Sequence, residues 1–295
     1  MRTLGRSITA AVVLFAAASA FAGDTLPPNP QPGKDRYTLF NPVPDDQQRE
    51  FEPDRPSQFT GPTTVDAGHF QLEMDLVNAI YDRHNPDRAR VDVDQWNAAP
   101  FDLRIGLTKN TEIDFLYEGY INVRTRDRDA HTDRTQSGFG DLTLLFKYNL
   151  FGNEGGTFAF GILPYLKLPT NTAHLGNKRV EGGVELPLNI NLPGNFQLSI
   201  QTEFDAVRND ADTRYEAAFT NIAYLGYNFL DKKLTVYGEW YSRVNQGPDS
   251  EVDGEVDAGL IYFIGKSAEV DIGCNFGVTR AAPDYQPFVG LSVRY

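Results

Sequence analysis

The chain has 295 residues, of which 41% are hydrophobic and 23% charged, and its formal net charge is −13. This acidic excess disfavours nucleic acids and anionic lipid headgroups as partners, because both are themselves negatively charged. After the first 22 residues, no apolar run approaches the roughly 18 residues that predict a membrane-spanning helix. A place in a membrane would therefore require β-strands.

Residues 1–22 have the organisation of a secretory signal peptide. Arg2 and Arg6 precede an apolar run over residues 8–18, and the triplet Ala20-Phe21-Ala22 has the small residues of a cleavage site. The alternative is a retained N-terminal helix, which is disfavoured because the run is shorter than the about 20 residues needed to cross a bilayer. We expect cleavage, which leaves 25 basic and 40 acidic residues in the mature chain.

Residues 23–66 form a proline-rich, polar segment in which no period of 2 or 3.6 residues is found. It includes Pro27-Pro28-Asn29-Pro30 and Asn41-Pro42-Val43-Pro44. This composition predicts an extended or disordered periplasmic lead-in. The alternative is that part of the segment folds into the mouth of a barrel as a plug.

From residue 67 to residue 295 the chain alternates apolar residues with polar or small ones. In the first such stretch, Leu72 and Met74 alternate with Glu73, which is the period of a strand between an apolar and a polar medium. In the third stretch, the same alternation places Ile121 on the apolar face and Asn122 on the polar face. We predict twelve strands of this kind, within residues 70–76, 99–105, 112–123, 141–148, 157–167, 179–190, 196–205, 215–227, 234–244, 255–264, 269–278 and 286–295.

The connections between these strands differ in length on the two sides. Most of those after the odd-numbered strands are longer and charged, as in residues 82–94 and 125–136. An even number of strands with short turns at one end and longer loops at the other is typical of a transmembrane β-barrel, and here it places both termini in the periplasm. Short, turn-rich connections follow the even-numbered strands, at residues 108–110, 151–156, 192–195, 230–232 and 265–268.

A soluble β-sandwich or barrel also alternates, but it turns its apolar face inward. Two features favour the membrane. Lysine, which blunts the exposed edges of soluble sheets, is scarce, and aromatic residues gather towards strand ends as an interfacial girdle requires. The sequence therefore predicts an all-β fold, an antiparallel barrel of about 12 strands in the outer membrane of a Gram-negative bacterium.

The last predicted strand closes on an aromatic residue. Val289, Leu291, Val293 and Tyr295 share its apolar face. A terminal amphipathic strand of this kind resembles the signal by which outer-membrane barrels are recognised and inserted. We therefore expect outer-membrane lipid and the barrel-assembly machinery as partners.

The polar faces are predominantly acidic, and in a barrel they line the lumen. If water fills the lumen, these side chains should favour cations, with an attraction screened over about 8 Å. The alternative is that the charges pair across strands and fill the interior, since twelve strands lie between filled eight-stranded barrels and open porins. The predicted lumen-lining residues are Glu73, Asp75, Asp102, Arg104, Glu112, Asp114, Glu118, Asp141, Lys147, Lys167, Arg179, Glu181, Glu185, Glu203, Asp205, Glu239 and Arg243, with Glu255, Asp257, Glu269, Asp271 and Arg294.

Two weaker patterns suggest other chemistry. Residues 249–254 resemble the start of a calcium loop, but Leu260 stands where the closing carboxylate is required, so no metal site is predicted. His131 has Asp129 and Asp133 beside it, which would suit a hydrolase. Loop histidines beside aspartate are usually solvated, so we predict no catalytic residues, no cofactor and no enzymatic activity.

Several motifs resemble one family. Asp54-Arg55-Pro56-Ser57, the stretch over residues 61–73, Gly138-Phe139-Gly140-Asp141-Leu142 and the stretch over residues 164–170 are similar to motifs of the family described as "Putative MetA-pathway of phenol degradation". The resemblance extends over most of residues 54–295. It implies an outer-membrane channel for aromatic or other small hydrophobic compounds, and it supplies no catalytic residues.

The expected function is passive transport of small solutes through an acidic lumen. The alternatives are a side-chain-filled structural or binding barrel and an outer-membrane hydrolase. The sequence leaves the transported solute and the oligomeric state open.

Overall fold

The computed structural model describes residues 33–84, 90–209, 211–247 and 250–295. The predicted signal peptide, residues 1–22, lies outside them. Two short 3-10 helices, η1 (Lys34–Arg36) and η2 (Asp45–Gln47), precede the strands. No helix in the described ranges has the length and apolarity needed to cross a bilayer.

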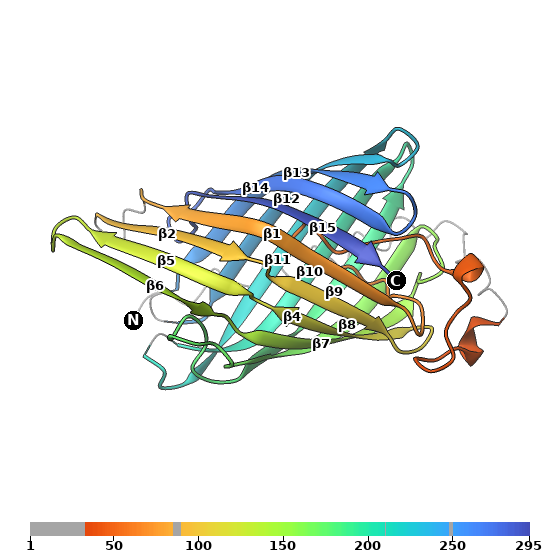
Figure 1. The fold of residues 1–295 in the computed structure, drawn as a ribbon, viewed down its shortest axis with the longest axis horizontal. Helices are drawn as coiled ribbons and strands as arrows, with labels where there is room; N and C mark the ends of the chain where they lie inside the picture. The colour runs from red at the N-terminus through yellow and green to blue at the C-terminus, as the bar shows by residue number, and fades with distance from the viewer. Residues whose placement is uncertain (1–32, 85–89, 210, 248–249) are drawn as a thin grey trace, which may run out of the picture.

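Fifteen antiparallel strands form a single sheet, shown in Figure 1. They are β1 (Phe70–Asp82), β2 (Val91–Ala98), β3 (Phe101–Gly106), β4 (Thr111–Tyr117), β5 (Tyr120–Asp127), β6 (Thr132–Phe139), β7 (Leu142–Phe151), β8 (Phe158–Leu168), β9 (Glu181–Leu192), β10 (Phe196–Arg208), β11 (Tyr215–Phe229), β12 (Leu234–Asn245), β13 (Val252–Ile264), β14 (Ala268–Gly277) and β15 (Tyr285–Arg294).

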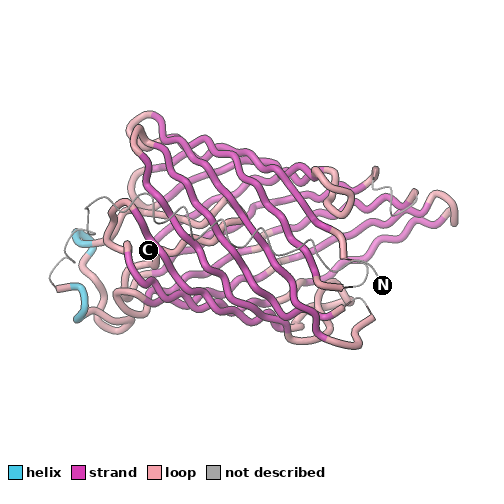
Figure 2. Tube along the Cα trace, turned by 180° about the vertical axis from the view of Figure 1, so that it is seen from behind, coloured by secondary structure: helices cyan, strands magenta, loops and turns pink. Residues whose placement is uncertain are grey.

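The sheet closes on itself as a barrel of twelve spans. Strand β15 pairs with β1, so the first and last spans are neighbours (Figure 1), and Figure 2 shows the barrel from behind. Three spans are each divided in two by a short break, as β2 with β3, β4 with β5, and β6 with β7. β1 pairs with β3 along its first half and with β2 along its second half. The predicted all-β antiparallel barrel of about 12 strands is confirmed.

A glycine in one break changes which way the following side chains point. Gly119 has φ 68°, and a Cβ at this position would lie 2.5 Å from the carbonyl oxygen of Ala98. The break shifts the alternation by one residue, so Ile121 is buried and pairs with the buried Asn97. The prediction that Ile121 lies on the outer, apolar face and Asn122 on the polar face is wrong for this reason.

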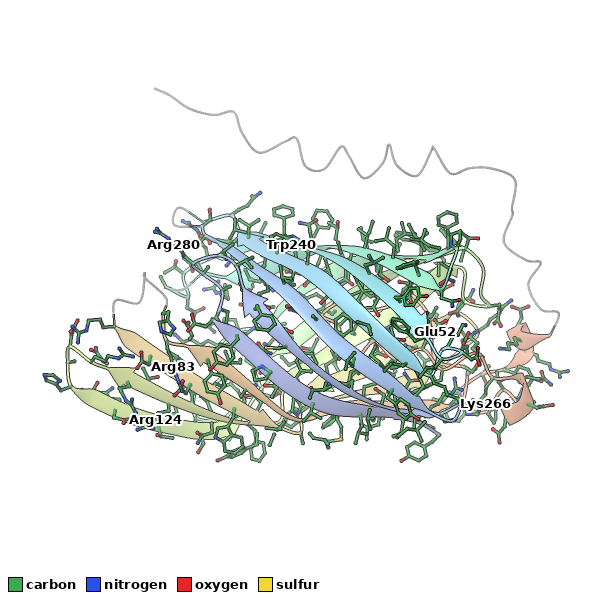
Figure 3. The ribbon with its side chains drawn as sticks, turned by 90° about the horizontal axis from the view of Figure 1, so that it is seen from above. Glu52, Arg83, Arg124, Trp240, Lys266 and Arg280 are labelled. Carbon is green, nitrogen blue, oxygen red and sulfur yellow. The ribbon has the colours of Figure 1, made fainter. Side chains whose placement is uncertain are left out.

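The two faces of the barrel wall differ in the sense expected for a membrane. Ile272 keeps 57% of its surface exposed on the outside, whereas Glu112 and Lys147, which point inward, are fully buried. Trp240 lies on the outer surface in Figure 3 and is also exposed. An apolar band around a charged interior is stable against lipid, where a Lys or Arg facing the mid-bilayer costs about 2–4 kcal/mol.

The two ends of the barrel also differ. The short turns lie at the same end as Tyr295 and the helices η1 and η2 (Figure 1). At the opposite end β2, β5 and β6 extend beyond the other strands, and Arg124 marks this extension in Figure 3. We call the two ends the turn end and the loop end.

Candidate functional site

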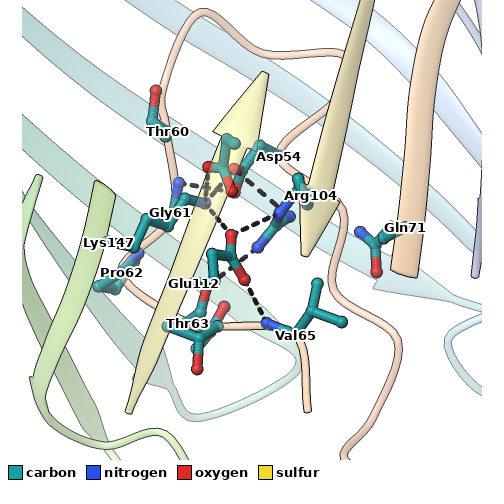
Figure 4. Close-up of polar contacts among 12 residues, drawn as sticks. Asp54, Thr60, Gly61, Pro62, Thr63, Val65, Gln71, Arg104, Glu112 and Lys147 are labelled. Carbon is teal, nitrogen blue, oxygen red and sulfur yellow. Dashed lines mark hydrogen bonds and ion pairs between the residues drawn. The ribbon is translucent and has the colours of Figure 1, made fainter. Parts of the chain in front are cut away.

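The segment over residues 49–66, which we call the inserted segment, lies inside the barrel. Asp54 forms an ion pair with Arg104 on β3, at 3.3 Å between Oδ2 and Nη1. The backbone N–H of Gln58 donates to Glu239 on β12, at 2.8 Å. The inserted segment therefore contacts strands on different sides of the lumen. Figure 4 shows the contacts of Asp54 with Arg104 and Lys147.

Two buried cations organise one side of the lumen. Arg104 lies 2.8 Å from both Glu73 and Glu112, through Nη1 and Nε respectively. Lys147 forms ion pairs with Asp54 of the inserted segment and, at 3.3 Å, with Glu112. Their ion pairs with Asp54 hold the inserted segment against this side of the barrel. Both cations are almost completely inaccessible to water, so water screens these ion pairs little.

The strand register explains how these charges come together. Glu112 on β4 lies directly opposite Lys147 on β7, and Arg104 on β3 lies opposite Asp114. Residues opposite each other on antiparallel strands point to the same face, with Cβ atoms about 4.5–5.5 Å apart. The alternation along each strand points these side chains inward, and the pairing between strands places each acidic residue beside a basic one.

A second group of charges, on β12, β13 and β14, contains no basic residue of its own. We call it the acidic wall, and its members are the inward-facing, buried residues Glu239, Glu255, Asp257, Glu269 and Asp271. The inserted segment supplies partners to four of them, and Ser292 on β15 donates to Glu269 at 2.8 Å. Arg55 contacts Asp271 at 2.8 Å and Asp75 on β1 at 2.6 Å, while the side-chain amide of Gln58 donates to Glu255 and Asp257, both at 2.9 Å.

A third group lies towards the loop end. The hydroxyl of Tyr165 on β8 lies within hydrogen-bonding distance of Glu203, at 2.9 Å, and of Asp205, at 2.7 Å, both on β10. Arg243 on β12 lies 3.3 Å from Asp205. Glu185 on β9 is directly opposite Glu203, so this group too has more carboxylates than cations.

Four predicted lumen residues lie at the loop-end rim instead of deep in the barrel. Lys167 forms an ion pair with Glu118, which lies in the break between β4 and β5. Asp141 accepts a hydrogen bond from the backbone N–H of Asn171 at 3.0 Å. Glu181, the first residue of β9, accepts one from the backbone of Arg208 at 2.7 Å. These residues hold the loop-end connections to the wall.

The placement of Arg179 in the lumen requires correction. Arg179 precedes β9 and lies in the connection over residues 169–180, with 62% of its side chain exposed. It is 3.5 Å from Asp212 in another loop-end connection. The alternation of polar and apolar residues in the sequence begins before Glu181, at Arg179. Strand pairing does not extend to these residues, because β9 begins only at Glu181.

Sequence reasoning missed Asp54, Arg55 and Gln58 as lumen residues. Their segment has no strand periodicity, and contacts between Arg55 and Asp271 join positions 216 residues apart. The available signal was the charged pair Asp54-Arg55 inside a proline-rich stretch, at the start of the motif that resembles a known family.

A cavity of about 1330 Å³ lies beside the inserted segment. Its lining runs from Lys232 and Lys266 in the turns to Glu269 of the acidic wall, and it includes Phe59 and Tyr224. Asn191, Gln197 and Ser199 also line it, so polar and aromatic groups both face the space. A second cavity, of about 490 Å³, adjoins Arg49, Glu52 and Arg104.

The aspartates beside His131 form ion pairs, and the calcium-like pattern begins at Asp249, which lies outside the described residues. Asp129 and Asp133, the neighbours of His131, pair with Arg90 at 3.1 Å and with Arg124 at 2.5 Å. Within the described part of the chain, no three His, Cys, Asp or Glu side chains are arranged to hold a metal ion.

A closed antiparallel barrel with an apolar exterior and a charged interior defines the class of outer-membrane β-barrels. The chain belongs to the family described as "Putative MetA-pathway of phenol degradation", whose model matches residues 53–295. The resemblance seen in the sequence is thereby confirmed.

Solved structures with the same architecture include the COG4313 outer membrane channel from Pseudomonas putida F1. It is 14% identical, with a TM-score of 0.59 over 83% of this chain and 100% of that chain, which establishes the shared fold. The NanC porin is 9% identical (TM-score 0.48; 75% of this chain, 98% of that chain). The β domain of the Bordetella autotransporter BrkA is 11% identical (TM-score 0.48; 77% and 98%). No curated protein sequence matches the chain significantly.

Proposed function

We propose that this protein is an outer-membrane channel for the passive transport of small solutes. The observation that carries the proposal is the cavity of about 1330 Å³ between the inserted segment and the barrel wall. Small barrels whose side chains fill the interior leave no such space. The similarity in fold to a protein described as an outer membrane channel adds support.

The charge of the lumen sets the preference among solutes. The acidic wall has five carboxylates, and Arg55 is the cation that the structure places against it. A narrow passage with an excess of fixed negative charge favours cations and disfavours anions. Passage needs no energy source in the chain itself.

The lining of the cavity fits aromatic or other small hydrophobic compounds. Phe51, Phe59, Tyr224 and Phe263 line it together with polar groups such as Gln197. Aromatic rings bind a flat apolar solute, and the polar groups orient it. The inserted segment narrows the lumen, so we propose that it controls the rate of passage.

We also propose how the protein reaches the outer membrane, by the route that other outer-membrane barrels use. Residues 1–22 are removed, and the barrel-assembly machinery inserts the chain by recognising β15. The outward position of Val289, Leu291 and Val293 on β15, the strand that closes the barrel with β1, supports this role. Mass spectrometry of the protein purified from outer membranes tests the cleavage, and a mature N-terminus other than residue 23 would contradict it.

Planar-bilayer conductance with a salt gradient tests the channel. The mature protein should give stepwise, cation-selective currents, and a version that lacks residues 23–58 should give larger ones, because Asp54, Arg55 and Gln58 are gone. A version that lacks only residues 23–46 serves as the control, since it keeps the inserted segment. Absence of current from all three folded proteins would contradict a channel.

One observation favours the alternative of a structural barrel without transport. The inserted segment joins β3, β10 and β12 through Arg104, Gln201 and Glu239, so it braces the lumen across its width. A barrel of this kind would be silent in the bilayer even after truncation, which is how the same experiment separates the two functions.

A further inference from the structure

The acidic wall has more carboxylate oxygens than hydrogen-bond donors. Arg55 forms an ion pair with Asp271, whereas Glu269 Oε2 has no hydrogen-bond partner among the described residues, and Glu239 Oε2 and Asp257 Oδ1 have none there but each other. All three side chains are at most 3% exposed. Buried carboxylate oxygens without donors or cations are energetically unfavourable, so this part of the lumen is set up for a further positive group.

Glu239 and Asp257 form the centre of this region. They lie directly opposite each other on β12 and β13 and point to the same face. At present the neutral Gln58 lies between them, its backbone N–H donating to Glu239 at 2.8 Å and its side-chain amide to Asp257 at 2.9 Å. Gln58 therefore marks where N–H donors fit.

A buried hydroxyl adds an independent polar group to the same place. Tyr237 is 3% exposed, and its hydroxyl has no hydrogen-bond partner within the described ranges. A Cβ on Gly259, two residues along β13 from Asp257, would lie 2.9 Å from that hydroxyl. Tyr237 also stacks on Tyr224, with ring centroids 5.2 Å apart, so aromatic faces lie beside the carboxylate pair.

The cavity reaches this region. Tyr224 and Glu269 line it, and so do Ser57 and Phe59, the residues on either side of Gln58. Glu239 and Asp257 do not themselves line the cavity, and Gln58, which is hydrogen-bonded to both, lies between two residues that do.

We propose that Glu239, Asp257 and Tyr237 form a binding subsite for an organic cation, a solute with an ammonium or guanidinium group on an aromatic or apolar body. The N–H groups of the cation replace the side-chain amide of Gln58 and form charge-assisted hydrogen bonds with both carboxylates, while the backbone N–H of Gln58 keeps its bond to Glu239. The body of the solute lies against Tyr224 and Phe59, where aromatic faces attract a nearby cation. This subsite rests on the proposed channel, because it names the class of solute that the channel selects.

Calorimetric titration of the refolded mature protein in detergent micelles tests the subsite, with benzylammonium as the probe and neutral benzyl alcohol as its isostere. We expect benzylammonium to bind at least about tenfold more tightly than benzyl alcohol, the size of effect typical of a charged hydrogen bond. The double variant Glu239→Gln with Asp257→Asn should weaken benzylammonium binding about tenfold or more. The matched control, Glu203→Gln with Asp205→Asn, removes two inward carboxylates outside the subsite and should leave binding within about twofold of the wild type.

A third variant keeps the carboxylates and the backbone N–H on Glu239 but removes the side-chain amide that donates to Asp257. Gln58→Ala should bind benzylammonium more tightly than the wild type, because the cation no longer has to displace an amide. Equal binding of the two probes, equal weakening by both double variants, or weaker binding by Gln58→Ala would overturn the subsite. The titration requires no current, so binding without conductance would contradict the channel and leave the subsite standing.

Discussion

Lys147 is a charged residue with no exposed surface, and its position depends on carboxylates from two sources. Glu112 comes from the neighbouring strand, whereas Asp54 comes from the inserted segment. Removal of one partner from a buried ion pair typically costs about 3–5 kcal/mol, because it leaves an uncompensated charge. Lys147 should therefore matter more to stability than any rim cation.

Replacement of Lys147 by Met tests this expectation. The free energy of unfolding should fall by about 3–5 kcal/mol, since Asp54 and Glu112 lose one of the two buried cations that they share, Arg104 being the other. Urea titration of the barrel in detergent, followed by the gel shift between folded and unfolded forms, measures the change. Lys167→Met is the matched control, because Lys167 is partly exposed at the rim and its pair should contribute about 0–1 kcal/mol. Equal losses in the two variants would contradict the role given to Lys147.

At the scale of single strands, two features are important, namely the breaks that divide some spans and the continuous outer faces of the others. The breaks at Gly119 and near Gly140 divide long spans and let the loop-end part of the wall extend outward (Figure 1). The uninterrupted strands, such as β14, keep one face towards lipid along their whole length. Each feature leads to its own prediction.

Gly119→Ala should destabilise the barrel by more than the left-handed conformation alone costs, which is about 1–2 kcal/mol. The added Cβ would collide with the backbone at Ala98, so β2 or β5 must shift. Gly155→Ala is the matched control, because Gly155 has φ 89° but open space around it. Thermal unfolding of the three proteins measures the difference, and an equal effect of the two substitutions would show that the break tolerates a side chain.

Ile272→Arg places a charge on the outer face in the middle of β14. It should cost about 2–4 kcal/mol if this face meets the centre of a bilayer, and Ile264→Arg at the end of β13 should cost about 0–1 kcal/mol. Equilibrium unfolding from lipid vesicles gives both values. A cost for Ile272→Arg no larger than that for Ile264→Arg would argue against the membrane depth assigned to β14.

At the scale of the whole molecule, the inserted segment and the barrel stabilise each other. The side chains of Arg104, Lys147 and the acidic wall face the lumen. The barrel strands alone do not provide enough ion-pair and hydrogen-bond partners for these side chains. The inserted segment provides donors, acceptors and one cation to these groups. Its removal should therefore affect stability as well as conductance.

The version without residues 23–58 should unfold at a lower temperature than the mature protein, because Glu73, Asp271 and Lys147 lose partners buried in the lumen. The gel shift of the folded form on heating measures this. The version without residues 23–46 should lose less stability than the longer deletion, since it removes the ion pair of Lys34 with Asp66 but keeps every contact made by Asp54, Arg55 and Gln58. An unchanged transition after the longer deletion would mean that water replaces those partners.

The sequence by itself determined the class of fold, the number of spans and, for most strands, which side chains face inward. These properties depend on a two-residue period within each strand, so they can be read locally, as for Glu73 on β1 and Glu239 on β12. The family also followed from short motifs. Arg179 and Ile121 were misplaced because alternation in a sequence does not reveal where pairing stops or where a glycine shifts the phase.

Only the tertiary structure decided the contents of the lumen. The inserted segment crosses the lumen and brings together residues far apart in the chain, as in the ion pair of Arg55 with Asp271. Which carboxylate oxygens of the acidic wall remain without a donor depends on the same long-range contacts. Such contacts depend on how the barrel closes and which residues its curvature brings together. The physical reason is that burial and electrostatic pairing are properties of the closed barrel, whereas strand periodicity is a property of each segment alone.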